Sequence, residues 1–240
     1  MVPPHTYFLA VFFVEVSFLF AVFFLVAVFF FFGAAFFFGA VFFFGAAFSL
    51  GASALPVLKT IASCDTTRFM GTWYVIGVKP TYLEKTCSNA VEKYTLLDEK
   101  CGDHDIDIDF KYNKKENPLD EGNKVKSLPQ KGWVQGGNRL QSGDWKVSPF
   151  WPVKMGYPII ELDEKDYSYA VVGYESRLYV WILSRTPTMD DDVYEGLKQK
   201  LAKDHQYDLN GLRKVPQVWT AEERAKRGLT NEELPDSFLN

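Results

Sequence analysis

Apolar and polar positions divide the chain into two parts. From Val16 to Leu58 there is no charged residue, and blocks of three Phe followed by Gly and Ala recur as a low-complexity tract. Beyond residue 64, short stretches that alternate with a period of two are separated by polar turns. Because successive side chains of a β-strand point to opposite faces, the second part is predicted to be an all-β domain.

The clearest alternation spans 105–110, where aspartate alternates with Ile, Ile and Phe. It indicates a strand with one buried and one solvated face, so the three aspartates are interpreted as a solvated face. No calcium-loop pattern with a glycine and a distal Glu follows them. A long charged loop is predicted at 113–131. Eight strands are predicted in all: 69–78, 90–97, 106–110, 132–140, 145–148, 157–162, 167–174 and 178–184.

A helix is predicted at 188–205, after the last strand. Three aspartates near its start suit the positive end of the helix dipole. Val193, Leu197 and Leu201 recur at helical spacing and form an apolar stripe that can pack on the sheet. The predicted organisation is a hydrophobic segment over 1–63, a barrel domain over 64–218 and a tail over 219–240. The tail is read either as a short helix at 219–227 or as disordered.

Two short signatures lie far apart in the sequence. Gly71-Thr72-Trp73-Tyr74 opens the first strand, and Trp181-Ile182-Leu183-Ser184-Arg185-Thr186-Pro187 closes the last. In an up-and-down barrel the first and last strands are neighbours, so Trp73 and Arg185 can meet at one end. A guanidinium over an indole face is a favourable cation–π contact. The two residues, with Gly71, are therefore predicted to form the floor of a barrel.

Three blocks carry a family resemblance. In order and spacing, residues 69–74, 163–172 and 179–187 resemble the lipocalins, most closely the branch of the bacterial outer-membrane lipocalin and apolipoprotein D. The resemblance covers residues 65–218. It implies an eight-stranded up-and-down antiparallel β-barrel with one C-terminal helix packed on it. Such a closed barrel can hold one small ligand.

The resemblance also implies which side chains point into the barrel. They are Val75, Gly77, Tyr157, Ile159, Ala170, Val172, Tyr179 and Trp181. This set is apolar or aromatic with two phenolic hydroxyls, which suits a hydrophobic ligand with at most one polar end. A fatty acid, lysophospholipid, sterol or pigment fits that description. The implied role is binding, storage or transport of a lipid, in membrane maintenance or stress protection, without a cofactor or a metal.

Two other functions stay open. Some plant and algal enzymes that act on carotenoid epoxides use a similar barrel with the same Gly-x-Trp start, but their Cys-rich extension is absent here. His5, His104 and His205 are scattered, and none has an evident nucleophile beside it. We therefore expect no enzyme activity. The second alternative is a membrane-tethered structural protein. The net charge of −4 and the lack of a basic stripe argue against a nucleic-acid partner.

The N-terminal tract holds 18 of the 22 Phe residues. A membrane-spanning helix needs about 20 apolar residues, so the tract is long enough for one or two. It is longer than an ordinary signal h-region and lacks a basic n-region. It is interpreted as a membrane anchor, a helical hairpin, an export or transit segment, or an expanded repeat without function. We favour export with membrane association.

Three cysteines occur, Cys64, Cys87 and Cys101. Ile61-Ala62-Ser63-Cys64 resembles the lipobox of bacterial lipoproteins, in which the Cys is lipidated, although Lys59 interrupts the apolar run. The alternative is a disulfide between Cys64 and Cys101, which both lie near the floor of the implied barrel. Cys87 lies at the opposite end and is left free. No Cys-x-x-Cys motif indicates zinc or redox chemistry.

Overall fold

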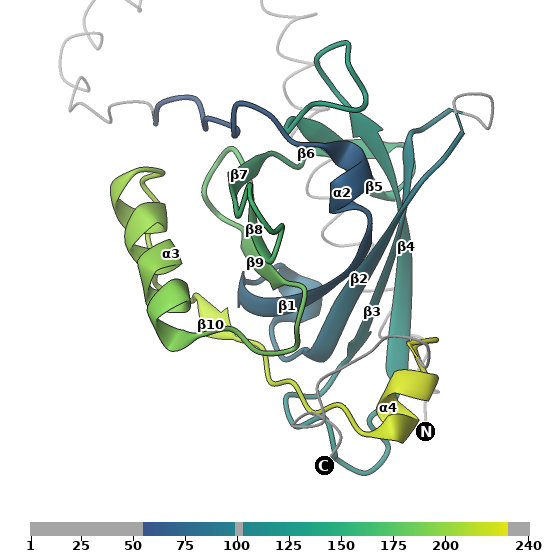
Figure 1. Cartoon of the computed structure of the whole chain (residues 1–240). Coiled ribbons are helices and arrows are strands. Elements are labelled where there is room, and N and C mark those ends of the chain that lie inside the picture. Colours follow the sequence, from purple (N-terminus) through teal and green to yellow (C-terminus); the bar gives the residue numbers. More distant parts are fainter. Residues whose placement is uncertain (1–54, 99–102, 230–240) are drawn as a thin grey trace, which may run out of the picture. The chain divides into compact units, whose positions relative to one another are not determined.

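The computed structural model describes residues 55–98 and 103–229. The Phe-rich tract, Cys101 and the residues beyond Leu229 lie outside the described residues. These described residues belong to one compact unit with its own core. Its sheet follows the order β6-β5-β4-β3-β2-β1-β9-β8-β7 with antiparallel pairing throughout (Figure 1). The strands are β1 Gly71–Lys79, β2 Ser88–Leu96, β3 Ile106–Asn113, β4 Val125–Val134, β5 Trp145–Phe150, β6 Val153–Gly156, β7 Ile159–Leu162, β8 Tyr169–Gly173, β9 Val180–Ser184 and β10 Arg213–Lys214. The helices are α2 Thr66–Phe69, η1 Tyr82–Glu84, α3 Asp191–Lys203 and α4 Ala221–Ala225.

The sheet curls so that its two ends meet. Strands β6 and β7 are consecutive parts of one extended segment, in which β6 pairs with β5 and β7 pairs with β8. At the junction, Tyr157 N donates to Trp145 O at 2.8 Å and Ile159 N donates to Gly143 O at 2.8 Å. With β6 and β7 counted as one strand and the two-residue β10 apart, the predicted eight-stranded up-and-down architecture is confirmed.

Strand β4 begins earlier than the sequence pattern indicates. Residues 125–131 were expected to end a charged loop, but they pair with β3 along their whole length. Strand β5 joins β4 only from Lys131 onward. Pro129 therefore lies where β4 has one neighbour, and a proline without an amide hydrogen is tolerated at such an edge. Residues 125–131 contain this proline and two lysines and show no apolar alternation, so the sequence pattern did not indicate a strand there.

A β-bulge in β1 reverses the expected direction of Gly77. Val75 pairs with Leu183 and Gly77 pairs with Ile182, so Ile76 is an extra residue in the ladder. A Cβ at Gly77 would lie 2.9 Å from Tyr194 Cε2, on the side of helix α3. The prediction that Gly77 points into the barrel is wrong, because an inserted residue shifts a two-residue alternation by one.

Helix α3 packs on the outside of the sheet (Figure 1). It begins after Asp190, whose side chain accepts hydrogen bonds from the backbone of residues 192 and 193. Its buried residues are Tyr194, Leu197 and Leu201. Val193 is 38% exposed, so the predicted stripe is wrong at that position, and Tyr194 takes its place. None of the helices in the described part of the chain is long and apolar enough to cross a membrane.

Apolar side chains form two cores, one on each face of the sheet. The interior core lies inside the curled sheet and includes Trp73, Tyr94 and Trp145. The residues at 106, 108 and 110 belong to it, which confirms the inward face predicted for that strand. The outer core lies between the sheet, helix α3 and the C-terminal segment, and it includes Tyr74 and Leu201.

Both flanking segments contact the barrel. Trp219 is buried in the outer core with its ring edge-on to Tyr74, 5.1 Å between centroids, and the Gln217 side chain donates to Val75 O at 2.8 Å. On the N-terminal side Leu58 is buried, and Ile61 N donates to Ile159 O at 3.0 Å. Residues assigned by sequence to a leader and a tail therefore pack against the barrel.

Candidate functional site

The floor of the barrel is built around Trp73 and Arg185. The guanidinium carbon of Arg185 lies 3.8 Å from the centroid of the fully buried Trp73 ring. The same guanidinium donates to Thr72 O at 2.9 Å and to Arg68 O at 2.7 Å. Gly71 has a φ of +94°, which favours glycine, and a Cβ there would lie 3.4 Å from Arg185 Nη1. The predicted contact between the first and last strands is present.

Replacing Arg185 with alanine is expected to lower the free energy of unfolding by about 1–2 kcal/mol, because the cation–π contact and the packing of the arginine stem are lost. Chemical denaturation followed by tryptophan fluorescence measures the change. Arg68→Ala is the comparison, since the Arg68 side chain is exposed, with its guanidinium carbon 4.0 Å from the centroid of the Tyr167 ring. Equal stabilities of wild type and Arg185→Ala would contradict a structural role for the floor.

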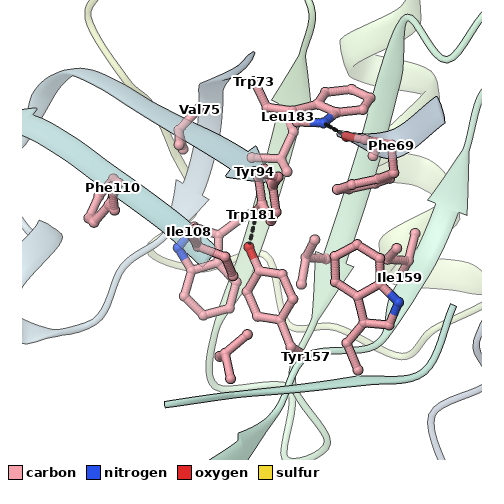
Figure 2. Close-up of a cluster of buried hydrophobic side chains, with 14 of the residues drawn as sticks. Phe69, Trp73, Val75, Tyr94, Ile108, Phe110, Tyr157, Ile159, Trp181 and Leu183 are labelled. Atoms are coloured by element: carbon pink, nitrogen blue, oxygen red, sulfur yellow. Dashed lines mark hydrogen bonds between the residues drawn. The ribbon is translucent and has the colours of Figure 1, made fainter. Parts of the chain in front are cut away.

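An apolar cavity of about 290 Å³ lies inside the barrel, away from the floor. Residues of β2, β3, β4, β5 and β9 contribute to its wall, together with helix η1. Figure 2 shows several of these side chains among those of the interior core. The cavity is lined by Thr81, Tyr82, Leu83, Glu84, Glu92, Phe110, Leu128, Gln130, Val147, Pro149, Phe150, Met155, Tyr157, Tyr179 and Trp181.

The predicted ligand residues divide into three groups. Those that line the cavity are Tyr157, Tyr179 and Trp181. Those that are buried in the interior core without lining it are Val75, Ile159, Ala170 and Val172. Gly77 faces helix α3 on the other side of the sheet. Near the floor the Phe69 ring packs against those of Trp73 and Trp145, and none of these three lines the cavity.

Sequence reasoning missed two carboxylates in the cavity wall, Glu84 and Glu92. Glu92 lies on β2 between the interior residues Ala90 and Tyr94, at a position where alternation places a side chain inside the barrel. A charged residue at an inward position of a predicted strand is the signal that could have found it. Glu84 lies in η1, a short 3-10 helix that the pattern did not indicate.

Glu92 is held by two tyrosine hydroxyls. Tyr94 donates to its Oε2 in a short hydrogen bond, and Tyr157 donates to the same oxygen at 3.1 Å. The two hydroxyl oxygens are 2.6 Å apart (Figure 2). The pKa of Glu92 is raised to about 7, mainly by burial and also by the Glu84 charge, while the hydrogen bonds from Tyr94 and Tyr157 lower it. This carboxyl group therefore changes its charge near neutral pH.

Glu84 closes one side of the cavity. Its Oε1 accepts from the Trp181 indole N–H at 2.8 Å, and its Oε2 accepts from the Thr81 backbone N–H at 3.1 Å. The hydrogen bond to Thr81 also closes a capping box for η1. Thus each of two aromatic cavity residues is fixed by a carboxylate, Trp181 by Glu84 and Tyr157 by Glu92.

The two described cysteines, Cys64 and Cys87, are buried and are not bonded to each other. Burial raises the pKa of each thiol to about 12. Cys101 lies outside the described residues, so a Cys64–Cys101 disulfide stays a prediction. Lipidation of Cys64 also stays a prediction. Within 55–98 and 103–229, no three His, Cys, Asp or Glu side chains gather to hold a metal ion.

The chain is similar in sequence and in structure to known proteins. A family model described as a lipocalin-like domain matches residues 64–217. The chain is 29% identical to temperature-induced lipocalin-1 of Arabidopsis thaliana over 170 residues, which cover 69% of this chain and 86% of that protein. It is 27% identical to the outer membrane lipoprotein Blc of Vibrio cholerae over 160 residues, which cover 67% and 86%. The structure of insecticyanin from the tobacco hornworm Manduca sexta matches with a TM-score of 0.48 and 16% identity over 68% of this chain and 85% of that one.

The family match extends over more than half of the chain and begins and ends close to the barrel and its helix. The curled antiparallel sheet, the Trp73–Arg185 floor and the interior cavity agree with it. This chain belongs to the lipocalin family.

Proposed function

We propose that the protein binds one small hydrophobic ligand in the interior cavity and stores or transports it. The observation that carries the proposal is an apolar cavity of about 290 Å³ whose wall is rich in aromatic rings. Concave sites with an apolar wall and a few placed polar groups are the usual sites for small ligands. Members of this family are generally binding proteins rather than enzymes. Among the described residues that line the cavity there is no cysteine, serine or histidine.

The rim of the cavity supports entry of an apolar molecule. Tyr82 and Leu83 of η1 and Phe150 of β5 line the cavity and are also exposed to solvent, Phe150 by 56%. Trp151, on the turn after β5, and Val153, the first residue of β6, are also exposed. Exposed apolar side chains around an opening favour contact with a lipid surface or with a hydrophobic ligand.

We further propose that the protein works in association with a membrane or after export. The charge-free N-terminal tract supports this, since so apolar a segment is not stable as an exposed tail in water. The relative from Vibrio cholerae is named an outer membrane lipoprotein. A role in membrane maintenance or stress protection is compatible with such a location.

A cavity-filling substitution tests the binding proposal. Leu128→Trp is expected to weaken binding of a neutral fluorescent probe, N-phenyl-1-naphthylamine, by about tenfold or more, because Leu128 lines the cavity and a larger ring occupies its volume. Fluorescence titration should give saturable binding near one site per chain for the wild type. Leu119→Trp is the matched control, since Leu119 is exposed outside the cavity. Equal loss in both variants, or no saturable binding by the wild type, would contradict the proposal.

A further inference from the structure

We propose that the cavity selects hydrophobic molecules with a cationic end, such as a long-chain amine or quaternary ammonium, over those with a carboxylate. This inference rests on the proposed function and narrows its ligand class. It is carried by the position of two buried carboxylates and three aromatic rings in one apolar cavity. A fatty acid, one of the ligands that the sequence suggests, is then a poor ligand.

The charge of the cavity wall has one sign. Among the described residues that line it, the ionisable acids are Glu84 and Glu92, and no Lys, Arg or His is present. Arg213 approaches from β10, but it donates to the backbone oxygens of Glu84 and Cys87 at 2.6 and 2.9 Å and does not line the cavity. A ligand carboxylate would therefore meet negative charge without a positive partner, in surroundings where such interactions are weakly screened.

Three aromatic rings of the cavity wall lie next to one another, close to the two acids. Tyr157 and Trp181 have ring centroids 5.9 Å apart, and Trp181 and Tyr179 have centroids 6.4 Å apart. The Tyr157 hydroxyl donates to Glu92 and the Trp181 N–H donates to Glu84, so the two rings are fixed by the two acids. Aromatic faces attract ammonium groups, and a set of such rings is the usual site for a quaternary ammonium.

The surroundings of Glu92 indicate that a bound cation can replace the proton on its carboxyl group. The Tyr94 and Tyr157 hydroxyls both donate to its Oε2, and their two oxygens lie 2.6 Å apart, so neither tyrosine supplies a positive charge to the buried carboxylate. A proton on Glu92 neutralises that carboxylate. The titratable groups that face Glu92 are these two tyrosines and Glu84, while Phe110 opposite it on β3 is apolar. A bound cation can take the place of that proton, so cation affinity should rise with pH near 7, where Glu92 titrates.

Three ligands with the same chain test the inference. Decyltrimethylammonium, decanol and decanoate are titrated by displacement of N-phenyl-1-naphthylamine from the full chain, kept in solution with an amphipathic polymer, and from residues 55–240 in parallel. At pH 8 the cation is expected to bind at least about tenfold more tightly than decanoate. Between pH 8 and pH 6 its affinity should fall, whereas that of decanol should not change.

Substitutions at the two acids locate the effect. Glu92→Gln is expected to bring the affinities for the cation and for decanol closer together and to remove the pH dependence. Glu84→Gln keeps an oxygen for the Trp181 N–H and should reduce the preference in part, which covers the case that Glu92→Gln does not fold. Glu121→Gln, on an exposed loop, should leave the preference unchanged. Circular dichroism of each variant checks its fold.

The outcomes separate this inference from the proposed function. If decanoate binds as tightly as the cation, or more tightly, the charge preference is wrong and a hydrophobic binding function stands. If decanol, the cation and decanoate all fail to displace the probe, both are wrong. A preference for the cation that survives in Glu92→Gln and Glu84→Gln alike would also overturn the inference, because the acids would not cause it.

Discussion

Replacing Glu223 with glutamine is expected to lower the free energy of unfolding by about 3–5 kcal/mol, because it leaves a buried charge without its partner. Glu223 on α4 accepts from Arg227 Nη1 at 2.9 Å, and the Arg227 side chain is fully buried. Arg227 Nη2 also donates to Asn113 Oδ1 at 2.5 Å, and Asn89 Nδ2 donates to Glu223 Oε2 at 3.3 Å. This network ties the C-terminal segment to strands β2 and β3.

Chemical denaturation followed by tryptophan fluorescence measures this loss, since Trp219 next to α4 reports on detachment of the segment. Glu222→Gln is the matched control on the same helix. Glu222 is largely exposed and pairs with Lys226 at 2.8 Å, so its loss should change stability by less than about 1 kcal/mol. Similar small effects in both variants would show that α4 does not depend on the buried pair.

The Glu223–Arg227 pair also predicts that the folded protein loses stability in acid. Burial raises the pKa of Glu223, but hydrogen bonds from Lys226 and Arg227 outweigh it and lower the pKa to about 2. The pKa of Glu223 in the folded state is then below its unfolded value of about 4.3. The ionised Glu223 therefore stabilises the fold above about pH 4.3, and this stabilisation is lost as the pH falls toward 2. About 3 kcal/mol should disappear in that range for the wild type. Glu223→Gln should lack this part of the pH profile.

A chain that begins at Cys64 is expected to be less stable than one that begins at Leu55 by about 4 kcal/mol. Burying the Leu58 side chain contributes about 1.5–3 kcal/mol, and Ile61 adds to this on the interior core. The shorter chain also loses the Pro56 carbonyl, which accepts from the buried guanidinium of Arg177 at 2.6 Å. Such a group is costly to leave without its partner.

Thermal and chemical unfolding of the two chains measures the difference. A third chain, from Leu55 with Leu58→Ala and Ile61→Ala, separates the apolar contribution from the backbone contacts. N-terminal sequencing and mass measurement of the native protein then show which start is used. An acylated Cys64 at the N-terminus, together with equal stability of the first two chains, would show that residues 55–63 do not stabilise the folded domain.

Alternation located several strands, and the family resemblance implied their up-and-down order. Alternation located the inward face of 106–110, and the Trp73 and Arg185 blocks related the first strand to the last. The start of β4 and the direction of Gly77 were not predictable by this means. Pro129 is accommodated because β4 has only one neighbouring strand at that position, and Ile76 forms a bulge against β9. Both features depend on the neighbouring strand and cannot be recognised in the local sequence.

The cavity was less predictable than the sheet. Alternation shows which side chains point inward, and Val75, Ile159, Ala170 and Val172 do so, but it cannot show how far along the barrel the large rings leave space. Glu92 was missed because a charged residue is normally assigned to the solvated face. Two tyrosine hydroxyls, one of them from a segment 65 residues away, make its inward position stable.

The pairing of β1 with β9 also affects how the protein folds. Tyr74 lies opposite Ser184, so the first strand of the barrel pairs with β9 only when that strand, more than 100 residues later, has been made. At a synthesis rate of roughly 5–20 residues per second, β1 is available several seconds before β9. Contacts so distant in sequence also slow folding after synthesis. The nascent chain therefore has an open, unpaired sheet edge throughout this interval, the state in which a chaperone or an export apparatus can engage it.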